Sequence, residues 1–231
     1  MKTEELKNKL STLTIAEQLR EVAEMFPGRV VFTTSFGIED QVISHLIFTN
    51  DIPIEVATLD TGRLFPETYK VFSETIARYR KTIKVYFPDH EDVESMMTEK
   101  GPNSFYNSVE DRHECCRVRK LVPLGRALKG KDVWISGIRA SQSGNRANME
   151  WIEYDESKSL YKYYPLFNWS LEDVEKYIKE NYVPYNLLHD KGYVSIGCAP
   201  CTRAVEKGED FRSGRWWWES GSERECGLHI K

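Results

Sequence analysis

Five cysteines are the residues of this chain that could most readily do chemistry, and they fall into two groups. Four form two pairs: Cys115 is next to Cys116, and Cys198 is separated from Cys201 by two residues. Four thiolates in two pairs are the ligand set of a structural zinc ion or of an iron–sulfur cluster. The fifth, Cys226, stands five residues from the carboxyl end, where an accessible thiol could act as a nucleophile.

The spacing of the pairs bears on the kind of metal group that they would hold. Zinc sites commonly use C-x-x-C twice, because this spacing presents both sulfurs to one ion. Two adjacent cysteines on a helix point in directions about a third of a turn apart. Cys115 and Cys116 could therefore hold one compact cluster only where their helix is distorted or ends. The pattern favours a cluster over zinc, and two unrelated pairs of buried thiols, or a redox pair at Cys198 and Cys201, are the alternatives.

The surroundings of Cys226 differ from those of an ordinary free cysteine, which is usually a small buried hydrophobe. Its neighbours are glycine, serine and charged residues, so no core can form around it. A nearby cation favours the thiolate over the thiol, and Arg224 and His229 are the local candidates. The alternative is a spectator thiol on a frayed end.

Length and composition limit the classes of protein that fit. A chain of 231 residues can bury one sizeable core. Its 32 basic and 36 acidic residues give a net charge of -4, which does not favour a nucleic-acid or membrane-surface partner. No apolar run is long enough to span a membrane, and the amino terminus lacks the apolar core of a secretory signal. The odd cysteine count argues against a disulfide framework, so we expect a cytoplasmic protein.

Short β-branched runs alternate with helical patterns in the first half of the chain. This alternation predicts an α/β fold, with a mostly parallel twisted sheet flanked by helices. The predicted strands are residues 30–34, 54–59, 83–87 and 133–136, and the helices between them are residues 40–48 and 66–80.

The remaining chain is predicted from composition and capping signals. Residues 92–128 form a helical insert that carries the first cysteine pair, with a kink or restart at Pro123. Ser170 is the expected N-cap of a later helix. We expect residues 1–205 to form one domain, and residues 206–231, rich in glycine, serine and charge, to form a mobile tail.

Three turns follow predicted strands and suggest a nucleotide site. In parallel sheets, ligands bind beyond the carboxyl ends of the strands. A helix that starts just after a strand also offers its free N–H groups to an anion. Each turn alone is ordinary, and none is a Walker loop, but three at one edge predict a nucleotide site. The turns are residues 35–40, 60–63 and 137–139.

With these motifs over nearly its whole length, the chain resembles the assimilatory adenylylsulfate (APS) reductases, relatives of the phosphoadenylylsulfate (PAPS) reductases. The two cysteine pairs separate cluster-bearing APS enzymes from typical PAPS enzymes, which keep the terminal cysteine motif alone. The matching segments are residues 35–41, 59–63, 115–120, 136–139, 198–201, 212–219 and 225–229.

The resemblance implies an adenine nucleotide alpha hydrolase-like fold and a 4Fe–4S cluster on Cys115, Cys116, Cys198 and Cys201. It implies that Cys226 attacks the sulfur of APS, so that AMP leaves and an S-sulfocysteine forms. A thiol of thioredoxin or of a glutaredoxin-like carrier then releases sulfite, toward cysteine biosynthesis. The cluster would tune local charge and position rather than shuttle electrons.

The resemblance also assigns roles to individual residues. Cys226, Lys120 and His229 would be catalytic, with Lys120 between cluster and substrate. Residues 216–218, three tryptophans, would seat the base of the tail, with plain core packing as the alternative. The substrate-binding residues would be Ser35, Phe36, Gly37, Glu39, Asp40, Leu59, Thr61, Gly62, Arg119, Gly137, Arg139, Arg203, Arg212 and Arg215.

Two alternatives to APS reduction stay open at this point. PAPS, or both nucleotides, could be the substrate, and its 3′-phosphate would need an extra cation near the ribose. A zinc-stabilised nucleotide-binding sensor would keep the four-cysteine cage but need no reactive Cys226. The thiol carrier's identity and a homo-oligomeric state are also left open.

Overall fold

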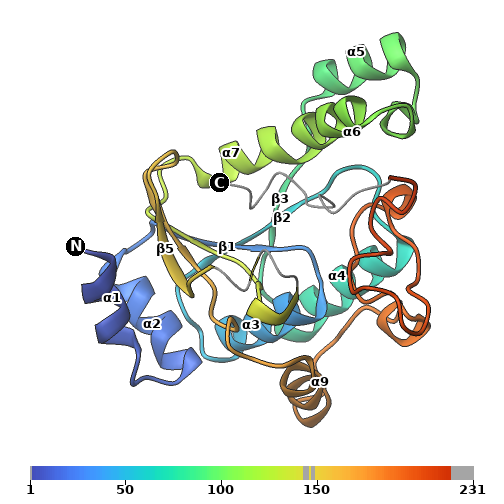
Figure 1. Cartoon of the computed structure of the whole chain (residues 1–231). Coiled ribbons are helices and arrows are strands. Elements are labelled where there is room, and N and C mark those ends of the chain that lie inside the picture. Colours follow the sequence, from blue (N-terminus) through green and yellow to red (C-terminus); the bar gives the residue numbers. More distant parts are fainter. Residues whose placement is uncertain (1, 143–145, 147–148, 220–231) are drawn as a thin grey trace. The chain divides into compact units, whose positions relative to one another are not determined.

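The structure is a computed structural model that describes residues 2–142, 146 and 149–219. Figure 1 draws the whole chain, coloured along the sequence. The chain divides into two compact units. We call the first the sheet unit; it comprises Met1–Thr58, Glu67–Lys84 and Gly130–Asn186. We call the second the cysteine unit; it comprises Leu59–Pro66, Val85–Lys129 and Leu187–Lys231. The expected boundary after residue 205 stays a prediction.

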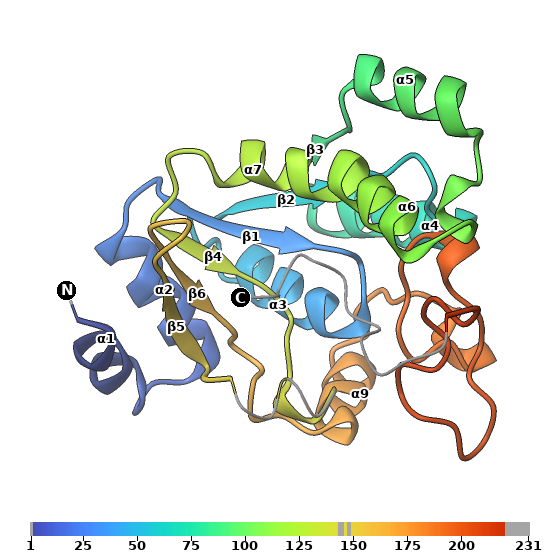
Figure 2. The same cartoon turned by 45° about the horizontal axis from the view of Figure 1, so that its top comes forward.

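The sheet has six strands in the order β3-β2-β1-β4-β6-β5. Strand β1 pairs in parallel with β2 and β4, and β4 pairs in parallel with β6, whereas β5 and β6 form an antiparallel hairpin (Figure 2). The prediction of a mostly parallel sheet is therefore confirmed. The strands are β1 (Val30–Thr34), β2 (Glu55–Leu59), β3 (Lys84–Tyr86), β4 (Val133–Ile135), β5 (Ile152–Asp155) and β6 (Leu160–Tyr163).

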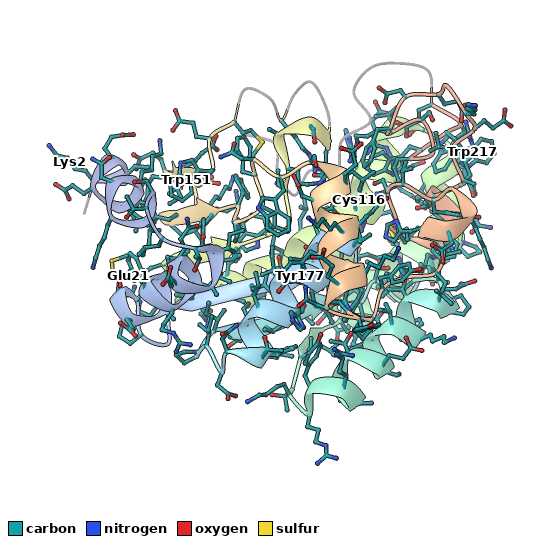
Figure 3. The ribbon with its side chains drawn as sticks, turned by 90° about the horizontal axis from the view of Figure 1, so that it is seen from below. Lys2, Glu21, Cys116, Trp151, Tyr177 and Trp217 are labelled. Atoms are coloured by element: carbon teal, nitrogen blue, oxygen red, sulfur yellow. The ribbon has the colours of Figure 1, made fainter. Side chains whose placement is uncertain are left out.

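The core of the sheet unit forms where helix α3 packs on the central strands. Phe32 on β1 and Ile135 on β4 are completely buried, as are Val42 and Ile43 on α3. Each such side chain stabilises the fold by about 1.5–3 kcal/mol. Helix α9 lies against α3, and Figure 3 shows Tyr177 on it. The unit's helices are α1 (Thr3–Leu10), α2 (Ile15–Met25), α3 (Ile38–Thr49), α4 (Pro66–Tyr79), η3 (Ala140–Gln142) and α9 (Leu171–Glu180).

The cysteine unit is built from short helices and loops. Helix α6, the π-helical turn η2 and helix α7 follow one another without a break (Figure 1). Pro123 lies in the first turn of α7, directly after the π-helical turn η2, so the type of helix changes at the position where the sequence predicted a kink or a restart. The helical elements are α5 (His90–Lys100), η1 (Ser104–Tyr106), α6 (Val109–Cys116), η2 (Arg117–Leu121), α7 (Val122–Leu128), η4 (His189–Lys191) and η5 (Ala199–Cys201).

Helix starts in the sheet unit follow the capping chemistry of the sequence. Ser170 caps α9 by accepting from the N–H of Asp173, whose carboxylate accepts in return from the N–H of Ser170, as predicted. Thr14 and Glu17 make the same reciprocal box at α2. Such caps contribute about 1 kcal/mol each. In the described part of the chain, no helix combines the length and the apolar character needed to cross a bilayer.

Candidate active site

The turn between β1 and α3 is held by the buried carboxylate of Asp40. Its Oδ2 accepts hydrogen bonds from the backbone N–H of Ser35 at 2.6 Å and from the Ser35 hydroxyl at 2.7 Å. The backbone N–H of Gly137, just after β4, also donates to this carboxylate. A Cβ at position 137 would overlap Asp40 Oδ1. Asp40 therefore ties two predicted substrate-binding turns of the sheet unit to each other.

Burial raises the pKa of Asp40 from 3.8 to about 6, because a carboxylate loses its hydration there. The hydrogen bonds from Ser35 oppose that shift, and the neighbouring charge of Glu39 adds to it. The group is thus poised between its two protonation states near neutral pH. Its bonds all run to the turns that it braces, which makes Asp40 a positioning residue.

Glu39 and Arg139 form a second buried link in the sheet unit. Glu39 Oε1 accepts from Arg139 Nε at 2.8 Å and from Gln142 Nε2 at 2.9 Å. Arg139 also donates to the Ser141 hydroxyl at 2.7 Å, and only 2% of its surface is exposed. The two predicted site residues are brought together, with a carboxylate neutralising the guanidinium. Gln142 is a member of this network that the sequence did not single out.

Phe36 contributes its backbone to the turn. Its φ is 60°, in the left-handed region that side chains other than glycine rarely adopt. The ring is 1% exposed and stacks on Phe72 with centroids 4.7 Å apart. This packing holds the strained residue and leaves Gly37 as the N-cap of α3. The first N–H groups of α3 have no partner within the helix, so they can bind an anion.

The loop after β2 belongs to the cysteine unit and contacts both cysteine segments. The Thr61 hydroxyl lies 3.3 Å from Cys198 Sγ, within hydrogen-bond reach. Arg119, one turn beyond Cys115, donates to the Thr61 carbonyl at 2.7 Å. Gly62 has a φ of 71°, and a Cβ there would meet Arg119. Thr61 thus lies beside Cys198 and Gly62 lies beside Arg119, whereas Leu59 is the last residue of β2.

All four paired cysteines line one cavity in the cysteine unit. Helix α6 ends at Cys116 and the π-helical turn η2 begins at the next residue. The helix is therefore distorted at the adjacent pair, as the spacing argument required. The cavity is lined by Arg63, Phe105, Arg112, Cys115, Cys116, Arg119, Lys120, Cys198, Pro200, Cys201 and Trp216.

The thiols are buried and electrostatically coupled. The pKa of Cys201 is raised to about 12, chiefly by burial and then by the nearby Cys198, while Lys120 opposes the shift. Burial likewise raises the pKa of Cys115, against the charge of Arg119. Without a counter-charge such thiols stay protonated, so a bound metal group is what would convert them to thiolates.

The donors around this cavity fit an anionic group. Arg112 Nη1, Arg119 Nε and Trp216 Nε1 are buried and have no hydrogen-bond partner among the described residues. Thiolate ligands with cationic neighbours suit an iron–sulfur cluster. Over the described part of the chain, no three cysteine, histidine or carboxylate side chains are grouped closely enough for one metal ion. Each iron of a four-iron cluster takes a single thiolate.

The remaining predicted cations are placed unequally. Arg215 lies over the ring of Trp216 at 4.7 Å and Arg212 lies at 5.8 Å, both buried. Arg203 instead forms a bidentate pair with Glu209, with both distances 2.7 Å. Lys120 lines the cavity. The predicted nucleophile Cys226 and its neighbour His229 lie outside the described residues.

Two basic residues that line this cavity were not among the site residues predicted from the sequence. Arg63 lines the cavity from the loop after β2, and Arg112 lines it from α6. Arg112 precedes Cys115 by three residues and Cys116 by four, which is the spacing of neighbours on one helix face. That spacing was the signal that could have identified it.

Comparison with known proteins places these features in a family. The phosphoadenosine phosphosulfate reductase domain matches residues 29–204. An adenosine 5'-phosphosulfate reductase of Sinorhizobium fredii is 51% identical over 225 residues, covering 97% of this chain and 89% of the relative. One of Agrobacterium fabrum is 50% identical over 221 residues, covering 96% of this chain and 85% of the relative.

Two solved structures have a similar fold, and the first is of the same family. The phosphoadenylyl-sulfate reductase of Candida auris, in a phosphate complex, is 32% identical with a TM-score of 0.75, covering 88% of this chain and 96% of that one. The FMN adenylyltransferase of Candida glabrata, with AMPCPP and FMN, is 15% identical with a TM-score of 0.54, covering 90% and 69%; it shares the fold alone. The chain belongs to the phosphoadenosine phosphosulfate reductase family.

Proposed function

We propose that this protein is an adenylylsulfate reductase, an oxidoreductase that converts APS to sulfite and AMP with electrons from thioredoxin-type thiols. The observation that carries the proposal is the cavity in which both cysteine pairs meet. The cysteine pairs are the feature that distinguishes APS enzymes from typical PAPS enzymes. Support comes from relatives about half identical over nearly the whole chain, which are named adenosine 5'-phosphosulfate reductase.

In this proposal the sheet unit supplies an anion site. The N-terminus of α3 offers free N–H groups and a positive dipole end to a phosphate. Asp40 fixes the turn that carries these groups, and Glu39 fixes Arg139. Because Glu39 is paired with Arg139 and Asp40 accepts hydrogen bonds from the turns, the unit presents backbone N–H groups rather than negative charge.

The chemical steps run through Cys226. Its thiolate attacks the sulfur of APS, a sulfur–sulfur bond forms, and the bond from sulfur to the AMP oxygen breaks with AMP taking the electron pair. A carrier thiolate then attacks Cys226 Sγ, sulfite leaves, and a mixed disulfide remains. The carrier's second thiol resolves it, so the carrier loses two electrons and the sulfur gains two. His229 would favour the thiolate of Cys226.

The cysteine unit would hold a 4Fe–4S cluster on Cys115, Cys116, Cys198 and Cys201. When bound, the cluster supplies local negative charge and a rigid anchor for the surrounding cations. Lys120 and Arg119 line the same cavity, and their charge would stabilise oxygen atoms that become more negative as the nucleotide leaves. A reducing cytoplasm would keep the carrier and the nucleophile as thiols.

The proposal is tested by following product formation with purified holoprotein, APS and reduced thioredoxin. Sulfite and AMP should form in equal amounts, and the thioredoxin should become oxidised in the same amount. Formation of AMP without sulfite would show simple hydrolysis and would refute the proposal.

PAPS is the second candidate substrate, because the structure resembles a solved phosphoadenylyl-sulfate reductase with a TM-score of 0.75. Parallel assays with APS and PAPS separate the two. A ratio of kcat/KM well above one for APS over PAPS is the expected result, and a ratio below one would reassign the substrate.

A further inference from the structure

Arg112 and Glu219 form a buried ion pair within the cysteine unit. Arg112 Nε donates to Glu219 Oε1 at 2.6 Å, and the side chains are only 2% and 11% exposed. We infer that these are positioning residues that hold the base of the catalytic tail against the cysteine helix and so set where Cys226 can reach. The inference rests on the proposed function, in which Cys226 is the nucleophile.

The segment that ends at Glu219, residues 215–219, is called the tail base here. It is tied to the second cysteine pair through its backbone, because the Trp216 N–H donates to the Cys201 carbonyl at 3.2 Å. Arg215 forms an isolated β-bridge with Thr202, the residue after Cys201. The tail base is therefore built directly on the C-terminal cysteine segment.

Trp216 makes the attachment rigid. Its side chain is completely buried, and its φ of 44° is in the left-handed region. A non-glycine residue keeps such a conformation only where the surrounding structure imposes it. Here the guanidinium of Arg112 and that of Arg215 each lie 4.7 Å from the Trp216 ring centroid. Trp217, labelled in Figure 3, is by contrast 48% exposed.

Arg112 also connects the tail base to the first cysteine pair. It lies on α6 one turn before Cys115 and Cys116, and it lines the same cavity. Its Nη1 is buried and has no hydrogen-bond partner among the described residues, while its Nε is bonded to Glu219. One guanidinium thus faces the thiols and holds the tail base. The tail base is therefore attached to both cysteine segments, which would share the proposed cluster.

The anchor limits the reach of the nucleophile. Cys226 follows Glu219 by seven residues, so it can lie at most about 24 Å from that anchor. If the tail base detached as far back as Thr202, the tether would be more than three times longer. The effective concentration of the Cys226 thiol at a bound nucleotide falls roughly as the −3/2 power of the tether length. The loss of the anchor should therefore slow attack on a bound nucleotide about fivefold.

The test uses full-length holoprotein with Glu219→Gln, which keeps the shape of the side chain and removes its charge. The matched control is Glu180→Gln, the same change in an exposed pair with Lys176 at 3.9 Å. Single-turnover sulfonation of Cys226 at saturating APS should slow about fivefold in Glu219→Gln and stay unchanged in the control. APS affinity and iron content should be unchanged in both, and Glu219→Asp, which keeps the charge, should recover most of the rate.

Limited trypsin digestion gives a readout that does not depend on activity. Arg215 is buried in the wild-type protein, and cleavage after it should be faster in Glu219→Gln. Removal of the iron from wild-type protein should have the same effect, which covers the case in which the variant does not fold. Wild-type rates of sulfonation and of cleavage in Glu219→Gln would overturn the inference. Failure of wild-type protein to sulfonate Cys226 would instead refute the proposed function.

Discussion

Glu39 accepts a hydrogen bond from Arg139 across 2.8 Å in the interior of the sheet unit, joining the first turn of α3 to the segment after β4. A buried guanidinium that loses its carboxylate keeps its charge without compensation. Glu39→Gln should therefore lower the free energy of unfolding by about 3 kcal/mol and weaken nucleotide binding. Urea unfolding and titration with AMP measure both effects.

The control for that experiment is Glu74→Gln, in an exposed pair with Lys70 at 3.9 Å. Exposed pairs of this kind contribute little, so this variant should match the wild type in both measurements. If Glu39→Gln were as stable as the control, the buried link would have no part in holding Arg139.

Asp40 should make stability depend on pH below neutrality. Its folded pKa is about 6, against 3.8 for the solvent-exposed carboxyl of an unfolded chain. Between these values the folded state binds more protons than the unfolded state, so this group's contribution to stability rises as pH falls. From pH 7 to pH 5 the wild type should gain about 1 kcal/mol relative to Asp40→Asn, which cannot titrate. Denaturant unfolding of both proteins at the two pH values measures the difference, and a constant difference would contradict the raised pKa.

Cys198→Ala should remove one of four proposed cluster ligands. We expect loss of iron and of the broad visible absorption, together with most of the activity. Cys226→Ser is the matched control and should keep the iron while losing turnover. Metal analysis and the visible spectrum measure both effects. Full iron content in Cys198→Ala would exclude Cys198 as a cluster ligand. A colourless wild type with stoichiometric zinc would favour the zinc-stabilised sensor.

Lys120→Ala should slow sulfonation by about 100-fold, because a preorganised cation at a developing charge contributes on that scale. Lys120 lines the cysteine cavity, whereas Lys129, exposed just beyond α7, serves as the control. Rapid-quench measurement of AMP release in a single turnover separates the step from carrier reactions. Equal rates in the two variants would remove Lys120 from the mechanism.

Much of the sheet was predictable because its strands are short, β-branched and followed by turn residues. The predicted strand at residues 30–34 is β1, and the predicted helix at residues 66–80 is α4, one residue shorter. The β5–β6 hairpin was not predicted. Its strand β6 holds a buried lysine, Lys162, which Asp155 neutralises at 2.7 Å. A lysine interrupts the apolar run that would predict a buried strand, and the sequence does not show that Asp155 is its partner.

Two amino-terminal helices, α1 and α2, were also missed, since each buries only two or three side chains and the rest of its surface is polar.

For the site, cysteine spacing indicated one shared cage and a distorted helix, and both pairs do line one cavity beside a π-helical turn. The partners of Arg139 and Arg112 could not be predicted. Glu39 is 100 residues from Arg139, and Glu219 is 107 residues from Arg112, so only the fold brings them together.

The most direct test of the central claim is to incubate holoprotein with ³⁵S-labelled APS in the absence of any carrier and to analyse the peptides by mass spectrometry. One sulfonate per chain should be found on the peptide that contains Cys226, and reduced thioredoxin should release it as sulfite. Label on any other cysteine, or AMP release with no labelled peptide, would contradict the assignment of Cys226 as the nucleophile.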